Sequence, residues 1–252
     1  MAIVESVHEN GITTLTLNRP EKRNAISQEL TRALYEALLE VAADPACRCL
    51  VITGKGGHFA AGRDLTNVSS KDPYDQILAN DDAWAGIFDT LYRLAAPSVA
   101  VVEGYAVAGG FTLAMGCDFV IAERGAKFGA LEMRGGFPAA VNTAVLSRLV
   151  GPRQSLELLL SADTFDADHL YRMGLINRIA DGPAQLAAFA AETTDKLVKL
   201  DQGAVKMTKE THRAVASLPL SDGLTMGKHL NALLMFAGKF DEAAKIYADS
   251  KK

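Results

Sequence analysis

The stretch VEGYAVAGGFTLAMGCD, from Val102 to Asp118, sets glycines where a buried strand gives way to an apolar helix. Glycine increases the backbone entropy lost on folding, so its presence there indicates a close backbone approach or an unusual dihedral angle. A loop of the same kind, HFAAGRDL (His58–Leu65), follows another apolar run earlier in the chain, so that HFAAGRDL is the first glycine loop and the stretch from Val102 contains the second. In α/β sheets, ligands gather at loops that follow the carboxyl ends of strands. The two loops therefore indicate an α/β core with a site at these loops.

Strand and helix patterns alternate along roughly the first 180 residues, which predicts a layered α/β core. The segment AIVESVHENGITTLTLN predicts two strands joined at Asn10-Gly11, a dipeptide typical of tight hairpin turns. Ser27 is suited to cap the helix that follows it. Towards the C-terminus the apolar spacing is helical throughout. We therefore expect a core at residues 1–195 and a helical region at residues 196–252.

The composition is that of an ordinary globular chain, with 252 residues, 49% hydrophobic and 22% charged. The formal net charge is -4 and no basic stripe is present, so nucleic acid is not an expected partner. The N-terminal segment MAIVESVHENG lacks the apolar run of a signal peptide, and no segment is long and apolar enough to span a membrane. Cys47, Cys49 and Cys117 lack zinc-site spacing and are expected to be reduced thiols. We therefore expect a cytoplasmic protein.

Several common catalytic motifs are absent from the sequence, namely G-x-G-x-x-G after a strand, the P-loop, G-x-S-x-G and H-E-x-x-H. Their absence removes the simplest nucleotide, serine-hydrolase and zinc-protease hypotheses. The two glycine loops favour a different hypothesis, in which one backbone N–H from each loop converges on one oxygen as an oxyanion hole. On spacing alone, two tight turns without a ligand are an equal alternative.

Five segments, in order along most of the chain, resemble motifs of the crotonase family, the enoyl-CoA hydratases and isomerases. They are LNRPEKRNAIS, ITGKGGHFAAGRDL, GYAVAGGFTLAMGCD, FGALEMRGGFPAA and YRMGLINRI. The resemblance implies an α/β spiral of ββα units, followed by C-terminal helices, which match less closely. It implies an acyl-CoA substrate of fatty acid metabolism, with coenzyme A entering as part of the substrate and no metal or redox cofactor. The implied assembly is a homotrimer or a dimer of trimers, with the C-terminal helices at subunit contacts.

The resemblance also implies that the oxyanion hole maps to the backbone N–H groups of Arg63 and Gly109. The thioester carbonyl would lie between them and carry the negative charge of an enolate. Gly109 would leave room for the thioester, and Gly110 would start the helix. Ala108 stands where the family commonly has glycine. Because Arg63 would act through its backbone, we expect its side chain to be solvated or salt-bridged.

Two-carboxylate hydratases of this family carry one glutamate at the position of Thr112 and another at that of Glu132. A threonine hydroxyl binds water but does not take its proton at neutral pH, so Glu132 is the candidate proton carrier. Its apolar neighbours Ala130, Leu131 and Met133 predict a raised pKa. One carboxylate is enough to move a proton between two carbons of one substrate. Hydration and isomerisation stay open, as do thioester hydrolysis, decarboxylation and an acyl-CoA-binding subunit without activity.

The resemblance implies further positions around the coenzyme A moiety and the acyl group. Lys22 and Arg23 would contact the phosphates. Family positions around the adenine and the pantetheine correspond to Ala25, Ala60 and Asp64. The stretch Thr66–Phe88 would shape the acyl pocket. The candidate lining residues are Tyr74, Trp84, Phe88, Ala108 and Met133, and ordinary core packing is the alternative for the three aromatic residues.

Overall fold

The computed structural model describes residues 2–64, 66 and 72–249. The chain divides into two compact units, Met1–Gln202 and Gly203–Lys252. This division follows helix α7 (Pro183–Val198), whereas the sequence pattern set the boundary between residues 195 and 196, inside that helix. The helix belongs with the first unit because Leu186 is buried against strands of the large sheet.

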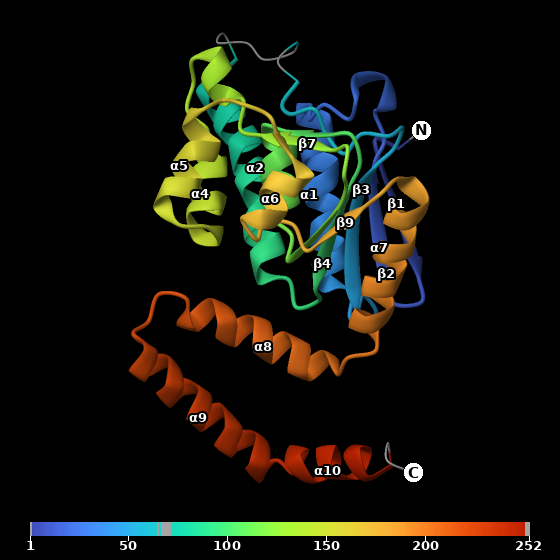
Figure 1. Cartoon of the computed structure of the whole chain (residues 1–252), viewed down its shortest axis with the longest axis vertical. Helices are drawn as coiled ribbons and strands as arrows, with labels where there is room; N and C mark the ends of the chain where they lie inside the picture. The colour runs from blue at the N-terminus through green and yellow to red at the C-terminus, as the bar shows by residue number, and fades with distance from the viewer. Residues whose placement is uncertain (1, 65, 67–71, 250–252) are drawn as a thin grey trace. The chain divides into compact units, whose positions relative to one another are not determined.

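Two sheets form the framework of the first unit (Figure 1). In the large sheet, β1 and β2 are antiparallel and the remaining neighbours are parallel. Its strands, in spatial order, are β1 (Val4–Glu9), β2 (Ile12–Leu17), β3 (Cys49–Gly54), β4 (Ser98–Val102), β6 (Phe119–Glu123) and β9 (Arg178–Ala180). The small sheet contains β5 (Tyr105–Val107), β7 (Lys127–Gly129) and β8 (Phe165–Asp166).

The predicted hairpin joins β1 and β2. Asn10 has φ 52° and Gly11 has φ 79°, so both turn residues adopt the left-handed region that this hairpin turn requires. The Ser27 hydroxyl accepts the Leu30 N–H at 3.1 Å, as expected of a helix cap. Both local predictions are confirmed because each depends on neighbouring residues alone.

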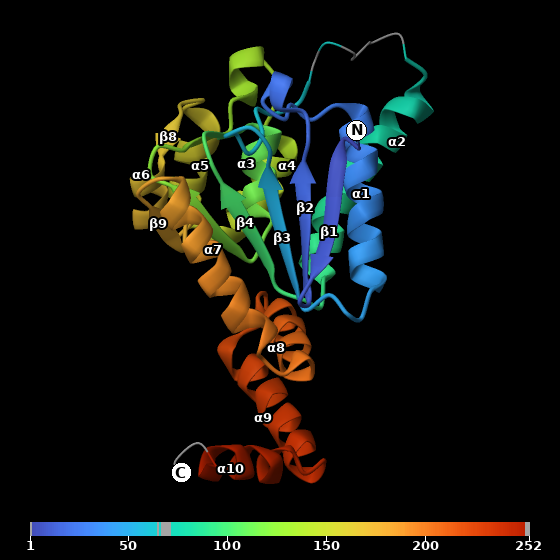
Figure 2. The same ribbon diagram turned by 90° about the vertical axis from the view of Figure 1, so that its right-hand side faces the viewer.

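Helices cover both faces of the large sheet (Figure 1), and its parallel strands lie side by side in Figure 2. Leu50 and Ile52 of β3 point into the larger core, while Cys49 and Val51 point towards α7. The larger core includes α1 and α2. The helices of this unit are α1 (Gln28–Ala43), α2 (Tyr74–Arg93), α3 (Gly109–Met115), α4 (Ala140–Leu149), α5 (Pro152–Leu160), α6 (Ala167–Arg172) and α7.

The second unit contains helices α8 (Gln202–Val215), α9 (Leu220–Phe236) and α10 (Lys239–Asp249). Neither α8 nor α9 buries a residue. Leu233, Met235 and Phe236 are 66%, 61% and 94% exposed, and their role in a subunit contact stays a prediction. Among the described helices, none has the length and apolarity needed to cross a bilayer. The architecture is the predicted α/β core with a C-terminal helical region.

Candidate active site

The two glycine-rich loops lie in contact. Ala60 is fully buried and pairs with β5: its N–H donates to the Tyr105 carbonyl at 2.8 Å, and its carbonyl accepts the Val107 N–H at 3.1 Å. Further along the same loop, Gly62 has φ +91°, and a Cβ there would lie 2.9 Å from the Ala108 Cβ. The strand pairing at Ala60 therefore brings the first loop against the start of α3.

The contact between the two loops requires a residue without a side chain at position 110, which is Gly110. A Cβ at Gly110 would lie 2.3 Å from the Ala60 carbonyl oxygen, which is backbone and has no rotamer to change. Ala108 adopts φ 48° and ψ -121°, a conformation that costs an L-residue on the order of 1–3 kcal/mol. Its N–H donates to the Gly129 carbonyl at 2.7 Å, which helps to hold this conformation. The glycines of the opening stretch thus permit a close approach of two backbones.

The N–H groups of Arg63 and Gly109 are the donors that the family resemblance implies for the oxyanion hole. Arg63 forms a parallel bridge with Ile26, whose N–H and carbonyl bond to Gly62 and Asp64 instead. In such a bridge the N–H of the middle residue points away from the partner strand. Gly109 is the first residue of α3, where an N–H has no intrahelical acceptor. Within the described part of the chain, neither N–H donates to the backbone.

Aromatic side chains of α2 lie next to Gly109. A Cβ at Gly109 would lie 3.3 Å from Trp84 Cζ2 and 3.3 Å from Ile26 Cδ1. Trp84 and Phe88 meet edge-on with ring centroids 4.9 Å apart, and both are half-buried. A Cβ at Gly116, which follows α3, would lie 3.0 Å from the Phe88 ring. The two aromatic residues therefore form an apolar wall along α3, the helix that starts at the candidate oxyanion hole.

Glu132 opens the 3₁₀ helix η3 (Glu132–Gly135), and its side chain is half-buried. The Asn142 Nδ2 donates to Glu132 Oε1 at 2.9 Å. The other oxygen, Oε2, is buried and has no hydrogen-bond partner among the described residues. Burial raises the pKa of Glu132, and the bonds from its own backbone and from Asn142 partly offset the rise. A carboxyl group with a raised pKa and a free oxygen is suited to accept and return a proton.

Thr112 lies in α3 and is 1% exposed. Its Oγ1 donates to the Ala108 carbonyl at 3.3 Å, so the hydroxyl hydrogen is directed to the backbone. Asn142 of α4, also 1% exposed, is a residue that the sequence reasoning missed. Its Nδ2 donates to the same Ala108 carbonyl at 3.3 Å, as well as to Glu132. The available signal was a polar residue within the apolar run AAVNTAVL.

The loop predicted to bind coenzyme A is tied to the first glycine loop through a residue that was also missed. Asn24 is fully buried, and its Nδ2 donates to the Lys55 and His58 carbonyls at 3.0 and 2.7 Å. The neighbouring side chains of Lys22 and Arg23 are exposed. The two predicted phosphate ligands therefore stand on an exposed loop that Asn24 holds in place.

Asp64 was predicted to lie near the coenzyme A moiety, and its side chain is 8% exposed. Oδ2 accepts from Arg19 at 3.0 Å, and Oδ1 accepts from the Thr66 N–H and hydroxyl at 3.1 and 2.6 Å. The bonds from Thr66 and Arg19 lower the pKa of Asp64 to about 2. Arg19 also donates to the carbonyl of the half-buried Ala25. Asp64 thus joins two loops, and contact of Ala25 or Asp64 with coenzyme A stays a prediction.

The remaining predicted positions differ in exposure. The Arg63 guanidinium pairs with Asp81 at 2.8 Å, and both side chains are about half exposed, which confirms the prediction of a solvated or salt-bridged side chain. Tyr74 and Met133, two of the candidate lining residues, are 78% and 43% exposed, so neither is packed in the core. Within the stretch Thr66–Phe88, residues 67–71 lie outside the described residues, as does Leu65 of the first glycine loop.

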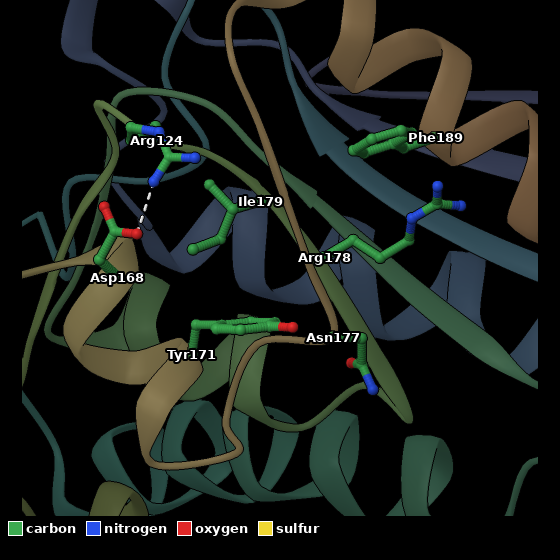
Figure 3. Close-up of a pocket in the computed structure, with 7 residues that line it drawn as sticks. All are labelled: Arg124, Asp168, Tyr171, Asn177, Arg178, Ile179 and Phe189. Carbon is green, nitrogen blue, oxygen red and sulfur yellow. Dashed lines mark hydrogen bonds and ion pairs between the residues drawn. The ribbon is translucent and has the colours of Figure 1, made fainter.

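A cavity of about 340 Å³ lies elsewhere, where β9 meets α6 and α7 (Figure 3). Its arginines are already paired, Arg124 with Asp168 and Asp181, and Arg178 with Glu192. None of its lining residues belongs to the predicted site. They are Arg124, Asp168, Tyr171, Asn177, Arg178, Ile179 and Phe189.

Comparison with known proteins supports a single family. The family model described as enoyl-CoA hydratase/isomerase matches residues 7–252. A crotonyl-CoA hydratase of Syntrophomonas wolfei is 34% identical over 205 residues, which are 80% of this chain and 77% of that protein. A short-chain-enoyl-CoA hydratase of Clostridium acetobutylicum is 32% identical over 208 residues, with the same coverage of 80% and 77%. The crystal structure of an enoyl-CoA hydratase of Mycobacterium smegmatis superimposes with a TM-score of 0.87 at 26% identity, covering 96% of this chain and 97% of that one.

Proposed function

Since the chain belongs to the enoyl-CoA hydratase/isomerase family of enzymes, we propose that it adds water to the double bond of a 2-enoyl-CoA. In this proposal Glu132 is the carboxylate that moves the proton. The observation that carries the proposal is the Glu132 side chain itself, with Oε1 held by Asn142 and Oε2 buried without a partner in the described chain. The names of the two hydratase relatives favour hydration over the other reactions of the family.

The substrate thioester carbonyl binds between the N–H groups of Arg63 and Gly109 in this proposal. Both groups lie where the two glycine loops touch, and both are free of backbone acceptors within the described residues. Such donors stabilise the charge that develops on the oxygen in the transition state. Each one typically contributes on the order of 10²–10³ in rate.

The reaction then proceeds through an enolate. Glu132 Oε2 takes one proton from water while the water oxygen bonds to C3 of the substrate. The electron pair of the C2–C3 double bond moves towards the thioester oxygen, between the two N–H groups. The protonated Glu132 then delivers its proton to C2, which completes the addition of one water molecule and restores the carboxylate.

Double-bond isomerisation is the second candidate, and Thr112 favours it. The hydroxyl of Thr112 donates to the Ala108 carbonyl, and threonine cannot take a proton from water at neutral pH. In an isomerisation, Glu132 takes a proton from C2 of a 3-enoyl-CoA and returns it to C4. This reaction uses the same two N–H groups and needs no water.

The coenzyme A moiety binds along the loop that carries Lys22 and Arg23 in this proposal. Both cations are exposed, and Arg23 lies 5.5 Å from the centroid of the Tyr105 ring, next to the first glycine loop. The acyl group extends along Trp84 and Phe88, whose rings form an apolar wall along α3. The proton transfers described here use no metal or redox cofactor.

The test is to incubate the pure protein in D₂O with 2-enoyl-CoA and 3-enoyl-CoA and to analyse the products by mass spectrometry. Addition of one water to the 2-enoyl-CoA is the expected result. A shifted double bond that carries deuterium but no added water would establish the isomerase instead. Release of free coenzyme A would indicate hydrolysis, and loss of CO₂ from an acidic acyl group would indicate decarboxylation. Binding without turnover across several acyl groups would contradict the proposal.

A further inference from the structure

The orientation of the Asn142 amide is fixed by its two acceptors. Nδ2 donates to Glu132 Oε1 at 2.9 Å and to the Ala108 carbonyl at 3.3 Å, which uses both amide hydrogens. A reversed amide would set Oδ1 against a carboxylate and a carbonyl, two acceptors without a proton to share. Oδ1 is therefore the amide atom that bonds neither Glu132 nor the Ala108 carbonyl.

Two buried oxygens at this point lack a donor. Asn142 Oδ1 and Glu132 Oε2 are both buried, and no group among the described residues donates to either. They belong to side chains that are already hydrogen-bonded to each other, and Asn142 is 1% exposed. A buried acceptor without a donor is costly, so the arrangement fits a ligand with two O–H donors. Water is the smallest molecule of that kind, and it is the co-substrate of a hydratase.

We propose that Asn142 is a second catalytic group, which takes the place of the second carboxylate of the two-glutamate hydratases. Its Oδ1 accepts one O–H of the water that is added, while Glu132 Oε2 accepts the other. Its Nδ2 holds Glu132 Oε1, so that Oε2 keeps its direction. This inference rests on the proposed hydratase function. Proton balance is unchanged, because Asn142 holds the water and Glu132 alone takes and returns its proton.

The first test is Asn142→Leu, which keeps the approximate volume and removes both polar atoms. We expect kcat for hydration to fall about 100-fold or more, with KM for the enoyl-CoA within about threefold. The acid limb of kcat/KM should move to higher pH, because the ionised Glu132 has lost a donor. The matched control is Thr143→Val on the same helix. Among the described residues the Thr143 hydroxyl bonds only the Ala139 carbonyl, so this variant should match the wild type.

The second test is Asn142→Asp, which keeps size and polarity if the leucine variant fails to fold. The introduced carboxyl and Glu132 would share one proton, and the pair with one proton keeps the donor to Glu132. The kcat/KM of Asn142→Asp should therefore rise with pH and then fall again at higher pH. We expect no such fall from loss of a shared proton in the wild type. A profile with the shape of the wild type's would show that the side chain at position 142 does not contact Glu132 during turnover, and this would overturn the inference.

The outcomes separate this inference from the function on which it rests. Absence of water addition by the wild type would overturn both. Hydration by the wild type, with kcat of Asn142→Leu within threefold, would overturn the inference alone. An acid limb that moves to lower pH with kcat retained would also overturn it, because Asn142 would then serve only to accept a hydrogen bond from the neutral Glu132 carboxyl.

Discussion

Two carboxylates of the first unit, Asp64 and Glu132, experience opposite environments. Both Asp64 oxygens accept hydrogen bonds, from Arg19 and Thr66, and its pKa is lowered to about 2. Glu132 accepts one side-chain hydrogen bond, from Asn142, while its second oxygen is buried without a donor in the described chain. Burial accordingly raises the pKa of Glu132.

The difference supports the proposal that Asp64 is a structural carboxylate and Glu132 a reactive one. Asp64 gains most of its stabilisation in the charged form, so it holds loops together and resists protonation. The charged form of Glu132 is stabilised at one oxygen by a hydrogen bond and destabilised by burial. At neutral pH its charged and neutral forms therefore lie closer in free energy than those of Asp64. Both residues sit in motifs shared with one enzyme family, and the hydrogen-bond partners are what distinguish their roles.

The strongest test of this contrast is Glu132→Gln. The amide keeps the size of the side chain but cannot take a proton, so we expect kcat to fall by about 10³-fold with acyl-CoA affinity nearly unchanged. Steady-state kinetics and calorimetric titration with an acyl-CoA measure the two quantities. The matched variant Asp64→Asn should keep kcat within about tenfold, because the proposed mechanism gives Asp64 no proton transfer. Normal turnover by Glu132→Gln would remove the distinction between the two carboxylates.

The second test acts on the backbone contact at Gly110. In Gly110→Ala, the new Cβ would approach the Ala60 carbonyl to 2.3 Å, so the loops must separate. We expect a loss of about 1–3 kcal/mol or more in the free energy of unfolding, together with a fall in kcat. Chemical denaturation and kinetics measure both. Gly125→Ala is the control, because a Cβ there meets nothing within 4 Å and its φ is not in the left-handed region. Equal stability of the two variants would contradict the required close approach.

The sequence was most informative where structure depends on neighbouring residues. Asn10-Gly11 and Ser27 act through local geometry, and both predictions are confirmed. The ion pair of Asp64 with Arg19 joins residues 45 positions apart, and no sequence pattern reports such a contact. Asn142 was missed for the same reason, because its importance comes from Glu132 and Ala108, which lie on other segments.

The third test concerns stability and its pH dependence at Asp64. Asp64→Asn removes the charge that Arg19 and Thr66 stabilise, and we expect a loss of about 1–3 kcal/mol at neutral pH. Because the folded-state pKa is about 2 and the ordinary value is 3.8, this contribution is fully present above pH 3.8 and is lost as the pH falls towards 2. The difference in denaturation midpoint between wild type and variant should therefore shrink from pH 7 to pH 3. A constant difference would show that the charge of Asp64 is not what stabilises the loops.

The smallest effect is expected for Arg63→Ala, although Arg63 is proposed to donate to the thioester oxygen. The substitution keeps the backbone N–H and removes only a guanidinium that is paired with Asp81, both side chains being about half exposed. We expect kcat within about threefold of the wild type and a stability change below about 0.5 kcal/mol. Kinetics and denaturation at low and high salt measure these quantities, with Asp81→Ala as the matched control. A tenfold fall in kcat for Arg63→Ala alone would place the side chain at the reacting oxygen. The expected result instead supports charge stabilisation by the backbone N–H of Arg63, so that a residue proposed to lie at the centre of the site tolerates the loss of its side chain.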